Sequence, residues 1–253
     1  MKLRLMICAA AASTALFAGE EATSATYAVM NVTNAYTDTV IAVPWVGLDG
    51  SPITISNLVN TTTLNNNDKL YMYNDDGTWY EYTKSGGVWT GAETITPEGT
   101  HTAESQVVQR GSGLILHRAS AGGTVLLCGR VDSDPIQTTI AAGGIETVDE
   151  TETFVPGKTL FANPCATNVD INVTFTGATI GDAIMIPQNN GRSVIYTYTN
   201  ATAQAEWGTF VEVSYQKNGR TRYKTEWQKG GEIPAGTGAW YESHGSSSHS
   251  IQW

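Results

Sequence analysis

The stretch TVIAVPW at residues 39–45 returns as TLFANPC at residues 159–165, and this pair of near copies decides the predicted fold. Each copy is almost continuously apolar and contains β-branched or aromatic residues, which is typical of a buried strand. A proline stands next to last in both copies and predicts the end of the strand, because proline has no N–H to donate to a neighbouring strand. The pair therefore predicts one founding strand in each half of the chain.

Four further segments of the first half recur in the same order in the second half. Residues 53–56, 68–72, 80–83 and 110–116 are matched by residues 171–174, 182–186, 196–199 and 235–241, respectively. Self-similarity along the chain is the signature of an internal repeat. We therefore predict a tandem duplication, with repeat 1 at residues 26–131, an acidic, Thr-rich linker at residues 132–158 and repeat 2 at residues 159–253.

Short strands and turns account for the rest of the predicted fold. Apolar and polar residues alternate at residues 53–58, and clusters of Asn, Asp and Gly close predicted hairpins at residues 69–84 and 209–227. The mature chain has no segment that sustains helical periodicity over three turns. The sequence thus predicts an all-β protein of two tandem homologous units, each a β-sandwich-like fold or a small barrel.

The register of the hairpin at residues 209–227 depends on the length of its loop. A two-residue Asn-Gly loop would set the apolar residues of the first strand opposite charged ones and mix both kinds on one face. A three-residue loop that ends at Gly219 instead matches Glu212 with Lys224 and separates the two kinds. We predict the three-residue loop.

The amino terminus has the features of a secretory signal peptide. Lys2 and Arg4 precede an apolar run at residues 5–18, which is too short for a transmembrane helix. We expect residues 1–25 to be a cleaved signal peptide. The mature chain has no second long apolar segment, and we expect it to be secreted and to lie outside the cell or at the cell surface.

The charge composition narrows the classes of partner. The chain has 253 residues and a net charge of -10, and its 14 Lys and Arg residues are distributed along its length. This balance disfavours nucleic acid and anionic membranes as partners. Only 15% of the residues are charged, while Thr, Asn, Ser and Gly are plentiful, which suits an extracellular β protein.

Two cysteines, Cys128 and Cys165, follow the signal peptide. Secretion favours a disulfide bond between them, because oxidising compartments preserve such bonds. A bond across this loop would stabilise the fold by about 4 kcal/mol in the chain-entropy model. The alternative is a pair of free, buried thiols that act as small apolar residues.

Residues typical of catalysis form no recognisable constellation. The histidines do not have the spacing of a zinc site; they are His101, His117, His244 and His249. Glu81 and Glu226 form a conceivable glycosidase pair, but neither has an acidic counterpart in the other repeat. The acidic residues at 146–152 lack the spacing of a calcium loop. We therefore predict no catalytic residues, no metal and no cofactor.

Aromatic residues are the stronger functional signal. The hairpin at residues 69–84 carries the candidate ligand-binding residues Tyr71, Tyr73, Trp79, Tyr80 and Tyr82. A loop with an even number of residues would place the four tyrosines on one face, whereas a three-residue loop would place two of them with the tryptophan. Exposed aromatic rings stack on the apolar faces of sugars. Most of the chain's seven Trp residues are still expected to fill the two cores.

The first functional hypothesis is a secreted, non-catalytic structural or surface-associated binding protein, with glycans or other copies of itself as partners. A carbohydrate-binding module that uses the aromatic hairpin is the alternative. A secreted glycoside hydrolase and an outer-membrane barrel are weaker hypotheses. Trp253 at the end of the last strand favours the barrel, but the predicted strands are short and uneven.

Overall fold

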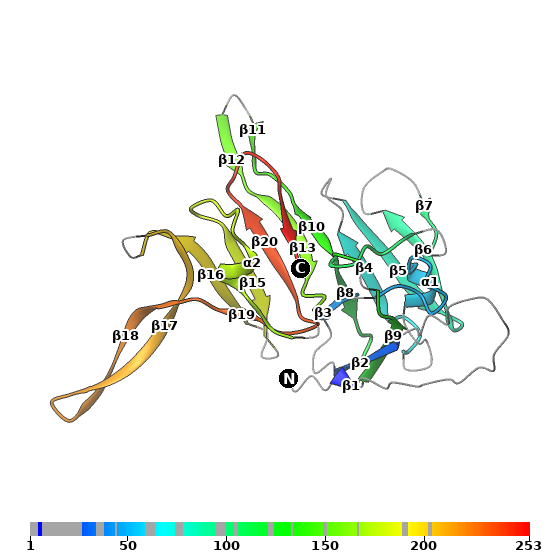
Figure 1. Ribbon diagram of the computed structural model, residues 1–253, viewed down its shortest axis with the longest axis horizontal. Helices are drawn as coiled ribbons and strands as arrows, with labels where there is room; N and C mark the ends of the chain where they lie inside the picture. Colours follow the sequence, from blue (N-terminus) through cyan, green and yellow to red (C-terminus); the bar gives the residue numbers. More distant parts are fainter. Residues whose placement is uncertain are drawn as a thin grey trace, which may run out of the picture.

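The structure is a computed structural model, and it confirms a mostly β protein with several antiparallel sheets, none of which is closed within the described part (Figure 1). It describes residues 5–6, 27–33, 38–43, 45–58, 64–73, 78–94, 100–103, 106–120, 124–132, 134–148, 151–165, 167–188, 192–201 and 204–253. Pro44 and most of the predicted signal peptide lie outside these ranges.

Two six-stranded sheets organise the molecule. The first sheet contains β3 (Asp38–Ala42), β4 (Lys69–Tyr73), β5 (Trp79–Ser85), β6 (Val88–Thr94), β7 (Thr100–His101) and β8 (Gly113–His117), in the order β3-β8-β4-β5-β6-β7. The second contains β13 (Gly157–Ala162), β15 (Ala183–Pro187), β16 (Ser193–Thr199), β17 (Glu206–Lys217), β18 (Arg220–Lys229) and β20 (Gly238–Ser243), in the order β13-β20-β15-β16-β17-β18. In both sheets the last strand lies between the first two.

Smaller sheets accompany each large one. β2 (Tyr27–Thr33) pairs with β9 (Thr124–Arg130) and with β1 (Leu5–Met6), and β10 (Gln137–Ile140) pairs with β21 (His249–Gln252). β14 (Val169–Asp170) pairs with β19 (Glu232–Ile233). Leu127 of β9 lies in the core of the first sheet, and Ile140 and Ile251 lie in the core of the second. Each large sheet is therefore layered against a pair of strands that flank it in sequence.

The predicted linker at residues 132–158 is structured over much of its length. Besides β10, it contains β11 (Gly144–Val148) and β12 (Thr151–Val155), which form a two-stranded hairpin that projects from the body (Figure 1). Glu146 and Glu152 of this hairpin are exposed to solvent.

The alternation at residues 53–58 corresponds to a helical turn, so the predicted strand is wrong there. α1 (Ile55–Leu58) buries Ile55 and Leu58, which lie three positions apart on one face of the turn. The side chain of Asn57 accepts a bond from the N–H of Thr54 at 2.8 Å. A matching turn, α2 (Ile171–Thr174), stands at the same place after β13 and is capped by the side chain of Asp170.

The predicted founding strands are present as β3 and β13, and their apolar residues lie in the cores. Ile41 is fully buried in the first core and Phe161 in the second. Each strand also reaches the opposite half: Ile41 bridges Thr237, and Phe161 bridges Ser112. The two large sheets therefore meet along a seam, which we define as the contact of β3 and β8 with β13 and β20.

Glycines make this close contact possible. Gly111 and Gly236 have φ angles of 84° and 66°, in the left-handed region that glycine adopts without strain. Two residues later, a Cβ on Gly113 would lie 2.8 Å from the carbonyl oxygen of Phe161, and a Cβ on Gly238 would overlap a methyl group of Val40. In each G-x-G pattern the first glycine thus adopts the left-handed turn conformation, and the second, which we call the contact glycine, allows the close approach of the other sheet.

Candidate functional site

The aromatic hairpin is formed by β4 and β5, and its register decides which rings reach the surface. Tyr73 pairs with Trp79, so the loop contains five residues, an odd number. Tyr71, Tyr73 and Trp79 therefore share one face and are half-buried. Tyr82 is fully buried in the first core, and Tyr80 packs against it. The register is thus that of an odd loop, and Tyr80 and Tyr82 do not join the other three rings.

A fourth ring, from the second sheet, completes the site. The ring centroid of Trp240 lies 5.1 Å from that of Tyr73 and 5.7 Å from that of Trp79. Tyr73 and Trp79 are 4.9 Å apart, and Tyr71 lies 6.4 Å from Trp79. We call Tyr71, Tyr73, Trp79 and Trp240 the seam cluster. Its tilted and edge-to-face rings have the geometries that aromatic pairs prefer.

Trp240 points to the seam because of the pleat of β20. Ala239 and Tyr241, its neighbours, are fully buried in the second core, so Trp240 projects from the opposite face. The hairpin and Trp240 are far apart in sequence, and sequence reasoning did not bring them together. The only signal in the sequence was the match of residues 110–116 with residues 235–241, which places Trp240 at the position of Ile115.

Polar groups surround the seam cluster. Lys69 and Glu81 form an ion pair at 2.5 Å, and His117 and Asp38 lie 2.6 Å apart. Hydrogen bonding to Glu81 raises the pKa of Lys69. Burial and the charge of Glu81 raise the pKa of Tyr71, so its hydroxyl remains protonated at neutral pH. The site therefore combines flat apolar rings with carboxylate, ammonium and hydroxyl groups at their margin.

The seven tryptophans divide into two classes. Trp45, Trp89 and Trp207 lie in the cores and are at most 3% exposed. The other four are half-buried: Trp79, Trp227, Trp240 and Trp253. Trp253 packs against the second core, and Trp227 donates a hydrogen bond to Glu206. The seam is the site at which two of the half-buried indoles contact each other.

Two buried carboxylates, Asp68 and Asp182, hold the ends of strands. Asp68 forms an ion pair with Arg118 at 2.8 Å and accepts bonds from backbone N–H groups. Asp182 accepts a bond from the hydroxyl of Tyr241 at 2.6 Å and likewise from backbone N–H groups. The hydrogen bonds of each carboxylate connect the start of one strand to the end of another. We therefore assign a structural role to both carboxylates.

The residues considered for catalysis lie apart. Glu81 pairs with Lys69 in the first sheet, and Glu226 pairs with Lys224 in the second. His244 stacks on Phe154, with ring centroids 5.6 Å apart. The side chain of His101 lies outside the described residues. Within the described ranges, no three His, Cys, Asp or Glu side chains gather to hold a metal ion.

Cys165 is half-buried, and burial raises the pKa of its thiol. The side chain of Cys128 lies outside the described part of the structure, so the disulfide bond stays a prediction.

Comparisons with models of protein families, with curated proteins and with solved structures found no match. Among the helices of the described ranges, none has the length and apolar character needed to cross a membrane.

Proposed function

We propose that this chain is a secreted, non-catalytic binding protein built from a duplicated β unit, and that it binds glycans at the seam cluster. The first unit runs from β2 to β9 and the second from β10 to β21. The shared strand order of the two large sheets supports the duplication, as does the pairing of the first and last strand of each unit.

Matching contacts within the two units also support the duplication. Asp68 accepts a bond from the N–H three residues before it and another from Ala119. Asp182 accepts a bond from the N–H three residues before it and another from His244. Ala119 and His244 are equivalent, because each lies six residues after the matched glycine of its unit, Gly113 and Gly238. Shared hydrogen bonds of this kind are expected of copies that kept one backbone while their side chains diverged.

The observation that carries the proposed glycan binding is the seam cluster itself. Half-buried tryptophan and tyrosine rings offer the apolar surface on which the C–H face of a sugar ring stacks. Lys69, Glu81 and His117 at the margin supply donors and acceptors for sugar hydroxyls. In the proposed site both units contribute rings, so the ligand would bind across the seam.

The pairing of acidic residues favours binding over hydrolysis. A glycosidase needs two carboxyl groups on either side of the bond that it cleaves. Glu81 is engaged by Lys69, and Glu226 lies on another sheet and is paired with Lys224. We therefore expect no reducing ends to accumulate when the protein is incubated with a polysaccharide that it binds.

Titration of tryptophan fluorescence with soluble polysaccharides tests the proposed function. We expect Trp79→Ala and Trp240→Ala each to weaken binding about twofold to tenfold, because one aromatic contact contributes about 0.5 to 1.5 kcal/mol. Trp227→Ala is the matched control, since Trp227 is also half-buried but lies outside the seam cluster. The proposal would be abandoned if no glycan changed the fluorescence, or if all three variants bound as the wild type does.

A further inference from the structure

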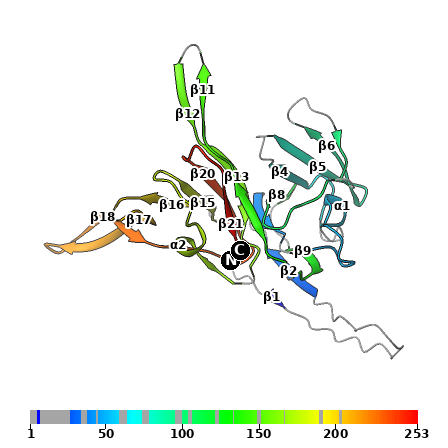
Figure 2. The ribbon, with the colours of Figure 1, turned by 45° about the horizontal axis from the view of Figure 1, so that its top comes forward.

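β17 and β18 form a two-stranded arm that leaves the body of the second sheet (Figures 1 and 2). We define the arm as residues 209–228. All of its residues are exposed except four, which are half-buried: Thr209, Val211, Val213 and Trp227. Phe210 is 63% exposed and Tyr223 is 65% exposed. A ribbon of two strands is only marginally stable alone in water, and β18 is an edge strand whose outer side has no partner among the described strands.

The turn of the arm differs from the predicted one. Lys217 pairs with Arg220, so the loop has two residues, Asn218 and Gly219, with φ angles of 53° and 70°. These positive angles are those of the type I′ turn that Asn-Gly favours. The predicted three-residue loop is wrong. That prediction assumes that one face of the hairpin is buried and must therefore be apolar, whereas the ribbon is exposed on both sides.

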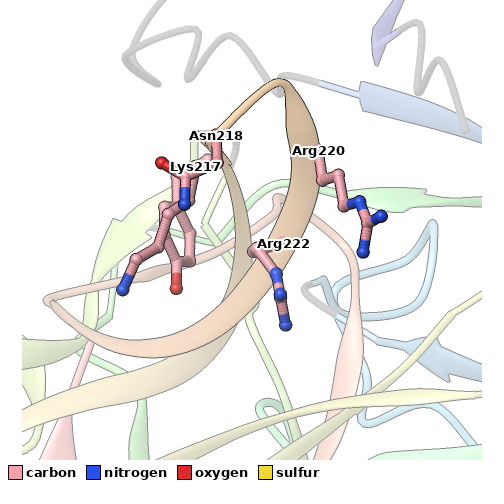
Figure 3. A pocket seen from close by; sticks show the side chains of 5 residues that line it. Lys217, Asn218, Arg220 and Arg222 are labelled. Atoms are coloured by element: carbon pink, nitrogen blue, oxygen red, sulfur yellow. The ribbon is translucent and has the colours of Figure 1, made fainter.

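The tip of the arm is strongly basic. Residues 217–224 contain four Lys and Arg residues and no acidic residue, in a chain whose net charge is -10. Figure 3 shows Lys217, Asn218, Arg220 and Arg222, which line a pocket at the tip of the arm together with Tyr215. The basic charge is therefore concentrated at this turn, although Lys and Arg residues occur along the whole chain.

The hairpin of β11 and β12 has the opposite character. We call residues 144–155 the acidic hairpin, because this segment contains four acidic residues and no basic one. Like the arm, it is a two-stranded ribbon with exposed apolar side chains: Ile145 is 67% exposed, and Phe154 is also exposed. The arm and the acidic hairpin are therefore complementary in charge, and both present apolar side chains to solvent.

The two ribbons leave the body in different directions in both views of the molecule (Figures 1 and 2). They cannot meet within one chain in this arrangement. The length of the arm is not required by the strand order of the large sheets, because β6 and β7 hold the places of β17 and β18 in the first sheet as shorter strands. These features indicate surfaces that serve contact with another molecule.

We propose that the arm of one copy of this chain docks on the acidic hairpin of a second copy. Arg220 and Arg222 would face Glu146 and Glu152, and exposed aromatic and aliphatic side chains of the two ribbons would bury each other. Different patches meet in such a contact, so it is heterologous and joins copies head to tail. The product is a ring if the rotation closes and an open filament if it does not.

Sedimentation velocity of the mature protein, over a range of concentrations, tests this proposal. At low ionic strength we expect concentration-dependent oligomers. Salt at 1 M shortens the screening length from about 10 Å at 0.1 M to about 3 Å, so we expect association to weaken about tenfold or more. Arg222→Glu should weaken association about tenfold, whereas Arg130→Glu, an equal change of charge at an exposed site on β9, should not.

A charge exchange makes the test specific. The arm variant R220E/R222E reduces the net charge of residues 217–224 from +4 to 0, and the hairpin variant E146K/E152K reduces that of residues 144–155 from -4 to 0. Each variant alone should therefore stay monomeric. A mixture of the two should associate, since the unchanged basic arm of the hairpin variant meets the unchanged acidic hairpin of the arm variant. Circular dichroism establishes that both variants are folded.

Three outcomes would overturn the proposal. The first is a wild type that stays monomeric at every concentration and salt, which would leave the basic residues as protection of a free sheet edge. The second is a mixture of folded variants that fails to assemble. The third is an arm that binds a polyanion such as heparin without any self-association of the chain.

Discussion

The contact glycine Gly113 allows a direct test of the seam. A methyl group on this residue would lie 2.8 Å from the carbonyl oxygen of Phe161 and 2.9 Å from the side chain of Leu160. Ordinary van der Waals contact begins at about 3.4 Å, so Gly113→Ala must move the two strands apart by about 0.6 Å. Overpacking of this kind costs about 1 to 3 kcal/mol. The neighbour that obstructs the methyl group is backbone, which has no alternative rotamer.

We expect Gly113→Ala to lower the free energy of unfolding by that amount and the Tm by about 2 to 12 °C, using about 2 to 4 °C per kcal/mol for a chain of this size. Urea unfolding and calorimetry measure the two quantities. Gly144→Ala is the matched control, because nothing lies within 4 Å of an added Cβ there and its φ is ordinary. Equal stability of the two variants would refute the close approach of the sheets.

A second variant at the equivalent glycine separates steric overlap from a general loss of stability. A methyl group on Gly238 would overlap Val40, which is a side chain and can be shortened. We expect Gly238→Ala to destabilise the protein and the double variant with Val40→Ala to recover part of the loss. A double variant that loses the sum of the two single effects would contradict the proposed contact.

Two further predictions concern buried polar groups. Asp68→Asn leaves Arg118 buried without its counter-ion, and we expect a loss of about 3 to 5 kcal/mol in urea unfolding. Burial lowers the pKa of His249, whose ring lies 5.6 Å from that of Tyr241. As the pH falls below about 6.5, the unfolded chain takes up a proton at His249 before the folded chain does, so stability decreases. Substitution of His249 by Asn should remove this part of the pH dependence, and an unchanged difference between pH 7.5 and 5.5 would contradict the assignment.

The periodicity of the chain predicted many of its elements. The buried strands β3 and β13 follow from apolar runs that can only be satisfied inside a core. The alternation along β4 leaves two arrangements, in which Tyr71 and Tyr73 share a face either with Tyr80 and Tyr82 or with Trp79. The structure has the arrangement with Trp79. The predicted match of residues 80–83 with residues 196–199 differs from the structure by two residues, because the strand registers align Thr83 with Thr197. Tyrosines at alternate positions permit a shift of two residues, which leaves every side chain on the same face.

The sequence by itself determined the strand-rich class of the protein, its repeated G-x-G turns and the aromatic character of one hairpin, because these depend on local spacing and backbone preference. Only the tertiary structure brought Trp240 to that hairpin and turned residues 55–58 into a helical turn. Both depend on which surfaces are covered by distant parts of the chain. Burial of a face makes its side-chain pattern decisive, whereas the exposed arm takes the register that its local Asn-Gly turn favours.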